Sequence, residues 1–408
     1  MSMRILGKKQ KLSYLIPLYI FIYLSTINYW RIIKGENSIE RSLFLFVIVL
    51  GLVFEIARLL RLKKISSTEG LFFVYMLYCL FSYMLSSYSD LSSAYAYVVL
   101  PSLLLGYYYF HRKLNTEYVI IIFIVCSIFV SLLTIYEFVF NQYVLITPTS
   151  QYGAFRPKAY ADSPLSLGSQ LSVSVILCYT MYKKNNRKRF LLCAVLTFIA
   201  LLFTQSRGPL VGCLIGLYVF YILNMRRLGK GNNKGIIGLI IGIGFILVFL
   251  LLVSSGAVSI QSNNVILNRL ISITNWGTDA GNLGRLKKWG LYLRFFSESP
   301  ILGKGIGFVT NSGNGVAESG VIQQLAETGV IGTVLYYLVV YKVLKKGTFV
   351  LKNKDTSKSI TGIGLISACI SIIIYNTVFQ IFSSTIGGTV FWILLSIIMV
   401  EYDKSIYH

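Results

Sequence analysis

Apolar runs of about twenty residues recur along almost the whole chain, and they constrain its fold more than any other feature. A run of that length spans a hydrocarbon core of about 30 Å as an α-helix. The strands of a membrane barrel would alternate apolar and polar residues, and no such alternation occurs. A bilayer offers no water to unpaired backbone groups, so helices must satisfy them within each segment. The runs therefore predict an all-α, polytopic membrane bundle.

We predict about twelve transmembrane helices in a single integral membrane domain over residues 1–408. Composition supports this class, because 55% of the residues are hydrophobic and only 13% are charged. An ordinary soluble domain could not keep that much apolar surface out of water. The expected spans are Leu12–Trp30, Ser42–Leu60, Gly70–Ser87, Ser93–Phe110, Tyr118–Phe140, Pro164–Tyr182, Phe190–Thr204, Gly208–Met225, Gly235–Ser255, Ser319–Leu344, Ser359–Ile381 and Ile386–Val400.

Lysine and arginine predict the orientation of these spans. If the N-terminus is cytoplasmic, most of the 38 Lys and Arg residues fall on that side, so we expect a cytoplasmic (inner) membrane protein with both termini in the cytoplasm. The net charge of +23 then reflects topology and contact with anionic membrane lipids. Nucleic acid is not an expected partner, because the basic groups are scattered between spans. These groups are Arg4–Lys11, Arg58–Lys64, Arg112–Lys113, Lys183–Arg189, Arg226–Lys234, Lys342–Lys358 and Lys404.

Two loops on the predicted outer face carry the residues of chemical interest. The first, residues 142–163, interrupts the helical pattern with proline and glycine and brings Arg156, Lys158 and Asp162 together. Short loops on that face otherwise hold few cations. A solvated loop would account for this composition. A ligand-facing Arg156 would account for it too, with Lys158 and Asp162 as possible substrate-binding neighbours.

Arg207 lies in the turn of a membrane hairpin, just before the span Gly208–Met225. Pro209 follows closely, so Arg207 stands at the start of a helix, where free backbone N–H groups and the helix dipole also favour an anion. A lone arginine at the end of a span can simply extend its charge to the interface. Because Arg207 opposes the local charge bias, we favour an anion-binding role.

The second and longest outer loop, residues 256–318, lies between the ninth and tenth spans. Within it, residues 282–296 have apolar side chains at helical spacing and predict an amphipathic interfacial helix. The next stretch, residues 299–315, has too many glycines for a helix and predicts a turn-rich wall over the outer face. The helix is expected to separate its apolar from its basic residues, which are Leu286, Trp289, Leu293 and Phe296 on the one hand and Arg285, Lys288 and Arg294 on the other.

Three carboxylates lie near the predicted outer face. Glu318 comes just before the tenth span, and Glu327, deeper in that span, is expected to pair or cap within the fold. Glu137, inside the fifth span, either lines a functional cavity or pairs locally, because an ionisable group in a span is costly. The chain has no metal-ligand cluster, no Walker sequence and no nucleophile elbow. We therefore expect neither a metal nor a cofactor.

Four short motifs follow one another between Arg156 and Gly332. They are SRG after an apolar run, GR followed by tryptophan, SPILGKGIG, and QQLAETGVIG entering a span. In this order they resemble the motifs of the O-antigen ligase and Wzy polymerase superfamily. The resemblance implies a GT-C-like membrane glycosyltransferase that polymerises undecaprenyl-diphosphate-linked repeat units into capsular, O-antigen or exopolysaccharide. Its active site would lie on the outer face of the membrane.

The resemblance also implies roles for particular residues. Arg207 and Arg285 match arginines thought to hold the lipid diphosphate, and Arg156 takes the place of a further outer-loop arginine. The ligase branch has a histidine where this chain has Glu318. That departure favours a polymerase, in which Glu318 is the candidate catalytic base for the acceptor hydroxyl. Lys288 and Arg294 are possible substrate-binding residues. A single, metal-independent displacement would invert the donor's anomeric carbon.

Two other functions are open from the sequence. A ligase would move finished glycan to another acceptor, and a transporter or flippase would carry lipid-linked sugars across the membrane. A transporter would place its charges along a path through the membrane midplane, whereas the strongest charges here gather on one face. We therefore expect a polymerase whose donor and acceptor are both undecaprenyl-diphosphate-linked glycans. Its further partners would be a chain-length regulator and a flippase of the same pathway.

Overall fold

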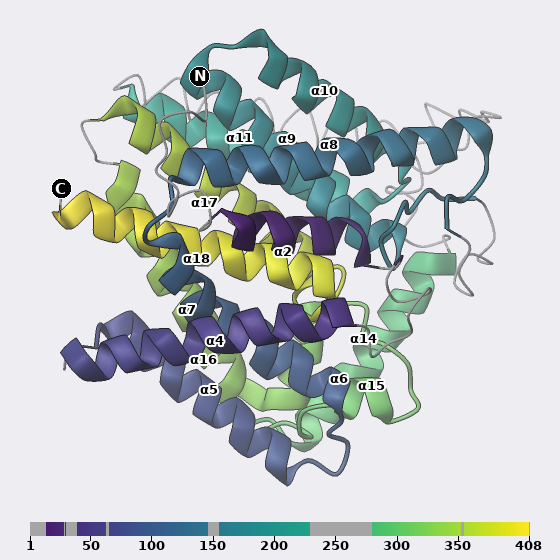
Figure 1. The fold of residues 1–408 in the computed structure, drawn as a ribbon. Coiled ribbons are helices and arrows are strands. Elements are labelled where there is room, and N and C mark those ends of the chain that lie inside the picture. Colours follow the sequence, from purple (N-terminus) through teal and green to yellow (C-terminus); the bar gives the residue numbers. More distant parts are fainter. Residues whose placement is uncertain are drawn as a thin grey trace.

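The computed structural model describes residues 14–27, 29, 39–62, 65–145, 155–228, 280–351 and 355–407. Every regular element within these ranges is a helix (Figure 1). Eight helices are long and apolar enough to cross a membrane, which confirms the predicted class of an all-helical, multi-pass membrane protein. They are α4 (Ile39–Leu62), α5 (Ser67–Leu85), α8 (Thr116–Phe140), α9 (Pro164–Asn185), α11 (Arg207–Arg227), α16 (Gly320–Leu351), α17 (Thr356–Asn376) and α18 (Thr385–Tyr407).

Three further predicted spans coincide with shorter or interrupted helices. α2 (Leu15–Ser25) and α10 (Lys188–Phe203) are shorter than the eight, and a π-helical stretch, η2 (Tyr95–Val99), separates α6 (Leu91–Ala94) from α7 (Leu100–His111). The predicted span Gly235–Ser255 and residues 256–279 of the long loop lie outside the described residues. The number of twelve spans and the extent of that loop therefore stay predictions.

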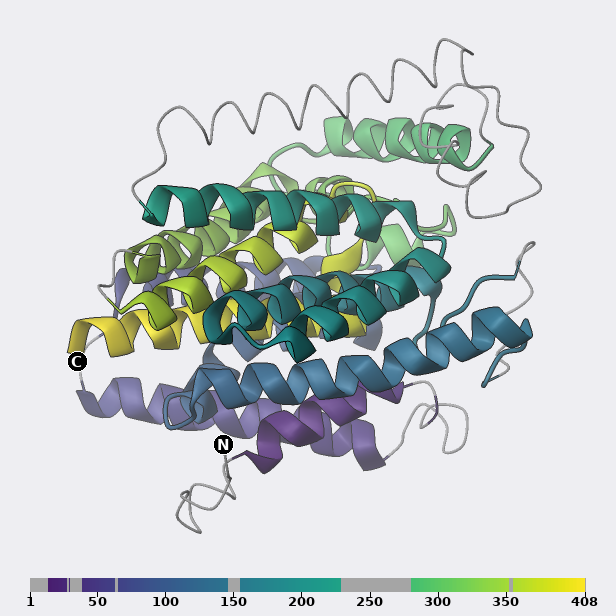
Figure 2. The same ribbon diagram turned by 90° about the horizontal axis from the view of Figure 1, so that it is seen from above.

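Helix α17 lies at the centre of the bundle, packed against α9, α11, α16 and α18 (Figure 2). Small residues let these helices approach closely. A Cβ atom on Gly212 of α11 would lie 2.7 Å from the Ser371 carbonyl oxygen, and one on Gly364 would lie 2.2 Å from Thr180 Oγ1 of α9. Close packing of this kind holds helices together where lipid removes the hydrophobic drive for association. It sets the register of α11 and α9 against α17.

The bundle has two chemically different ends. The C-terminus marks one, on the left of Figure 1, and α14 (Ala280–Glu298) and α15 (Phe308–Asn311) mark the other. We call the first the basic end, because basic side chains join its helices there: Lys404 Nζ donates to the Leu114 carbonyl at 2.8 Å, and Lys184 Nζ lies 3.1 Å from a Glu117 carboxylate oxygen. We call the second the site end.

Candidate functional site

Three helices begin around the end of α17. The Tyr375 hydroxyl donates to the carbonyl of Leu165, at the start of α9, over 3.3 Å. A Cβ on Gly208, the second residue of α11, would meet the Tyr375 ring at 2.5 Å. A Cβ on Gly320, the first residue of α16, would lie 2.1 Å from the Asn376 side-chain oxygen. The starts of α9, α11 and α16 therefore meet at the site end.

Arg156 is fastened to the turn between α10 and α11. Its Nη2 donates to Ser206 Oγ at 2.8 Å and to the Gln205 carbonyl at 3.4 Å, and its Nε donates to the Thr204 carbonyl at 3.3 Å. The next residue along the chain is Arg207, the first of α11, whose start also presents backbone N–H groups without carbonyl partners in the helix. Arg156 and Arg207 thus both lie at one helix N-terminus, and the guanidinium group of Arg156 is fixed there by hydrogen bonds.

Arg285 reaches the start of α16 from helix α14. Its Nε lies 2.9 Å from a carboxylate oxygen of Glu318, and Lys288 Nζ lies 3.6 Å from the other. The indole N–H of Trp289 donates to the Glu318 carbonyl at 3.3 Å. All three charged side chains are partly exposed, between 27% and 34%. A ligand can therefore reach this ion-pair cluster.

The two groups of cations lie around the end of one helix, α17. Glu318, the partner of Arg285, stands two residues before Gly320, which packs on Asn376 beside Tyr375. The ring of the same tyrosine packs on Gly208, next to Arg207. The structure thus brings the segments that carry Arg156, Arg207 and Arg285 to the same end of α17, near Tyr375.

The other candidate residues of the outer loops lie elsewhere. Lys158 is buried and its Nζ lies 5.3 Å from the centre of the Tyr143 ring. Burial lowers the pKa of Lys158 below its usual value, and the carboxylates of Glu137 and Asp162 oppose that shift. Arg294 is 79% exposed and lies 3.9 Å from Glu298 on its own helix. Substrate-binding roles for Lys158, Asp162 and Arg294 stay predictions.

Glu137 organises the loop that carries Arg156. Its carboxylate is fully buried and accepts three backbone hydrogen bonds, from the N–H groups of Val144, Lys158 and Ala159, at 2.8 to 2.9 Å. Glu137 was predicted either to line a functional cavity or to pair locally, and these contacts fit local pairing. The three hydrogen bonds tie both ends of the loop to α8, so Glu137 positions Arg156 without contacting it.

Helix α14 is present where the amphipathic helix is predicted. Leu286 and Leu293 are 45% and 44% exposed, whereas Tyr292 is fully buried and Arg285 turns toward Glu318. Exposed leucines are what a helix at a membrane interface requires, and the interfacial position of α14 stays a prediction. The cations face the site because Glu318, a residue distant in the chain, pairs with them.

Helix α16 has a break at Gly329 (φ +62°), which the sequence pattern did not predict. The break frees backbone groups, and the loop Pro300–Gly305 satisfies them. The N–H groups of Lys304 and Gly305 donate to the carbonyls of Ala326 and Glu327, and those of Val330 and Ile331 donate to Pro300 and Ile301, all within 2.8 to 3.3 Å. An interrupted membrane helix needs such partners. The glycines of SPILGKGIG are the signal that could have revealed it.

Glu327 completes this junction. Its carboxylate is fully buried, accepts the backbone N–H of Val309 at 2.8 Å, and receives Gln323 Nε2 at 3.2 Å. These contacts agree with the predicted role of Glu327 in holding the fold. They also join α15 to α16, so the wall of the site is fixed to the helix that begins at Glu318.

Strained backbone is concentrated at the site end. Five described residues other than glycine have positive φ, and two of them, Asn141 and Asn186, are ordinary helix C-caps. The other three are Ala159, Gln205 and Glu318. They stand next to the Arg156 loop, next to Arg207 and at the Arg285 ion pair. Conformations of this kind cost about 1–3 kcal/mol each and cluster at functional sites.

The fold and this site define a class: a polytopic helical membrane protein that gathers cationic side chains around one end of its bundle. Residues 192–337 match a family model described as O-antigen ligase. The matched segment includes Arg207, Arg285 and Glu318, whereas Arg156 precedes it. Over these residues the match confirms the resemblance to the O-antigen ligase and Wzy family seen in the motifs. It supports a membrane glycan transferase of the ligase or polymerase type, a family whose substrates are lipid-linked glycans. No curated protein matches the chain.

Proposed function

We propose that the protein is a polysaccharide polymerase that joins undecaprenyl-diphosphate-linked repeat units at the outer face of the cytoplasmic membrane. The observation that carries this proposal is that the segments carrying Arg156, Arg207 and Arg285 meet at one end of α17, with Glu318 in contact with Arg285. Glycosyl transfer from a lipid diphosphate requires groups that stabilise the anionic leaving group and a base that accepts the proton of the acceptor hydroxyl. The site supplies residues for both.

The arginines would hold the diphosphate. In the reaction, the acceptor hydroxyl oxygen bonds to the donor's anomeric carbon, the bond from that carbon to the diphosphate oxygen breaks, and its electron pair stays on the diphosphate. The leaving group thus gains negative charge. Guanidinium groups bind phosphate oxygens in pairs and never lose their own charge, so they stabilise this charge as it develops. Cations held in place beforehand lower the barrier most.

Glu318 would take the proton that the acceptor hydroxyl loses. In the structure its carboxylate is held by Arg285 and Lys288. Binding of a diphosphate would draw these cations to the phosphate oxygens and free a carboxylate oxygen for the acceptor. The Arg285–Glu318 pair would then serve both donor binding and proton transfer. It keeps Arg285 in position before the donor arrives, and it frees the Glu318 carboxylate as a base afterward.

The position of His111 favours a polymerase over a ligase. His111 is fully buried at the basic end, where its Nε2 lies 2.9 Å from Thr116 Oγ1. It is therefore at the far end of the bundle from Glu318. Among the described residues, a carboxylate and not a histidine is the base available to the acceptor at the site.

Purified full-length protein in liposomes tests the proposal. The probe is the undecaprenyl-diphosphate-linked repeat unit, extracted from source cells that lack this protein, and the readout is the ladder of polymer lengths. A polymerase makes a ladder without any other acceptor, whereas a ligase does not. Arg207→Ala and Arg285→Ala should each reduce the initial rate by about a hundredfold or more. The control is Lys287→Ala, which removes an exposed charge from α14. A normal ladder from either arginine variant would refute the arginine clamp.

A further inference from the structure

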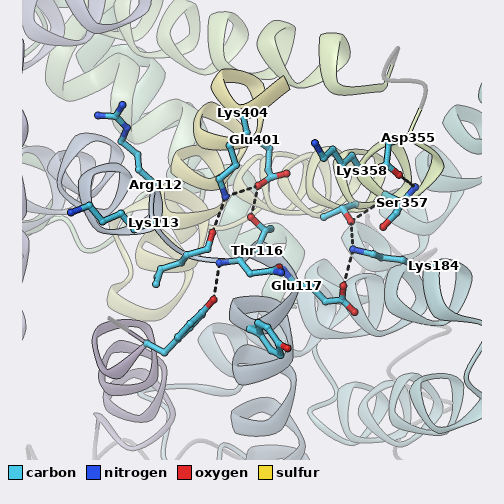
Figure 3. Close-up of a pocket in the computed structure, with 15 residues that line it drawn as sticks. Arg112, Lys113, Thr116, Glu117, Lys184, Asp355, Ser357, Lys358, Glu401 and Lys404 are labelled. Carbon is cyan, nitrogen blue, oxygen red and sulfur yellow. Dashed lines mark hydrogen bonds and ion pairs between the residues drawn. The ribbon is translucent and has the colours of Figure 1, made fainter. Parts of the chain in front are cut away.

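A second cluster of charged side chains surrounds a cavity of about 560 Å³ at the basic end. Its lining comes from the turn between α7 and α8, the end of α9, the start of α17 and the end of α18 (Figure 3). It lies at the opposite ends of α8, α9 and α17 from the arginines of the proposed active site. The cavity is thus separate from that site and independent of the proposed function.

Five basic and three acidic side chains line this cavity, and the acids are already engaged. Glu117 pairs with Lys184 at 3.1 Å, and Glu401 pairs with Lys404 at 3.2 Å. Asp355 accepts the backbone N–H of Ser357 at 2.8 Å, as the N-cap of α17. Two of the acids are paired with lysines and the third caps α17, so five cations face three carboxylates in the cavity wall.

The remaining cations are Arg112, Lys113 and Lys358. In Figure 3, Lys358 extends from the start of α17 toward Glu401 and Lys404, while Arg112 and Lys113, on the turn between α7 and α8, direct their charged ends away from those residues. Arg112 lies over the Tyr108 ring at 5.6 Å. Lys113 and Lys358 have no ion-pair or hydrogen-bond partner anywhere in the described ranges. The cavity therefore has an excess of positive charge.

Two long helices also direct their N-termini to the cavity. α8 begins at Thr116 and α17 at Thr356, and residues of both first turns line the wall. The positive ends of their dipoles add to the charge of the lysines. Ser357 and Thr361 supply hydroxyl groups beside Lys184, which lies 3.3 Å from Thr361 Oγ1. Cations, helix N-termini and hydroxyl groups together are the usual ligands of a phosphate group.

From this arrangement we propose that the cavity binds the phosphate headgroup of an anionic membrane lipid. The cavity opens at the ends of membrane-crossing helices, where headgroups lie in a bilayer. Tyr14 and Tyr118 line it and pack edge to face at 5.8 Å, as interfacial tyrosines do. Basic pockets between helix ends are known to select anionic headgroups. A soluble phosphate compound would share the chemistry of the site but not its position beside the lipid.

Binding measurements on purified full-length protein in a neutral detergent test the proposal. The probes are short-chain phosphatidylglycerol, phosphatidylcholine of the same chain length, and inorganic pyrophosphate. We expect phosphatidylglycerol to bind more tightly than phosphatidylcholine. The double variant Lys113→Ala with Lys358→Ala should weaken phosphatidylglycerol binding by about tenfold or more. Lys358→Arg, which keeps the charge, should bind nearly as well as the native chain.

The control is Lys345→Ala, which removes an exposed charge from the same end of the bundle outside the cavity. Circular dichroism establishes that each variant is folded. Equal weakening by Lys345→Ala would mean unspecific attraction and would overturn the site. Unchanged binding in the double variant would overturn it as well. Tight binding of pyrophosphate without any preference for phosphatidylglycerol would reject the lipid as the ligand.

Discussion

Arg285 and Glu318 form an ion pair of 2.9 Å that joins the surface helix α14 to the start of α16. The pair connects the residue proposed to bind the leaving group with the residue proposed to accept the proton. Glu318 reaches this position with a positive φ of 53°, which a side chain other than glycine adopts only at a cost. The surrounding contacts of Trp289 and Lys288 hold it there.

Glu318→Gln separates proton transfer from positioning. The amide keeps the shape of the carboxylate and can still accept a hydrogen bond from Arg285, but it is a very poor proton acceptor. We expect the rate of the first glycosyl transfer to fall by about a hundredfold to ten-thousandfold. Binding of the lipid-diphosphate donor should be retained, because the neutral amide pairs less strongly with Arg285 and leaves it available to the phosphate oxygens. Single-turnover kinetics and donor binding measure the two effects. A rate close to native would assign Glu318 a structural role only.

Gly329→Ala tests the break in α16. A Cβ there would lie 2.2 Å from the Ile301 carbonyl oxygen, and φ is +62°. We expect a loss of more than about 2 kcal/mol in the free energy of unfolding. Gly290→Ala in α14 is the matched control, since a Cβ at that position meets nothing within 4 Å. The control should be neutral or stabilising by up to about 1 kcal/mol. Denaturant unfolding in detergent measures both, and equal stabilities would contradict the packing of the loop on the break.

Gly208→Ala tests the packing of Tyr375 beside Arg207. The added Cβ would meet two atoms of the Tyr375 ring at 2.5 and 2.7 Å, so ring or helix must move. We expect a destabilisation of about 1–3 kcal/mol, and a loss of polymer synthesis larger than the loss of folded protein. Gly70→Ala, in the first turn of α5, is the control, because its Cβ would be 3.9 Å from its nearest neighbour. Native activity in Gly208→Ala would show that Arg207 does not depend on Tyr375.

Glu137→Ala tests how the Arg156 loop is held. The change leaves the backbone N–H groups of Val144, Lys158 and Ala159 without their carboxylate. Each lost partner costs about 1 kcal/mol or more. We expect faster cleavage of the loop by protease and reduced polymer synthesis in the same samples. Glu117→Ala removes a carboxylate at the far end of α8 and should leave the loop's cleavage rate unchanged. Equal cleavage of the native chain and Glu137→Ala would show that Glu137 does not hold the Arg156 loop in place.

The sequence predicted the class and most helices because their signals are local. An apolar run of about twenty residues needs no distant partner to indicate a span. The same reasoning set Arg207 at a helix start, which the structure confirms. It did not predict that Arg285 of α14 pairs with Glu318, because no local spacing connects the two residues. It also missed the break at Gly329, whose partners lie in a loop that precedes the helix.

What the sequence determined by itself is therefore a helical membrane protein with its charges outside the apolar spans, since hydropathy and helix length follow from neighbouring residues. Only the tertiary structure decided that the segments carrying Arg156 and Arg285 meet at one end of α17 and that Glu318 pairs with Arg285. It likewise assembled the basic cavity from the ends of α2, α7, α8, α9, α17 and α18. These contacts join residues far apart in the chain. They depend on how closely glycines such as Gly208 and Gly212 let whole helices approach, which no local pattern records.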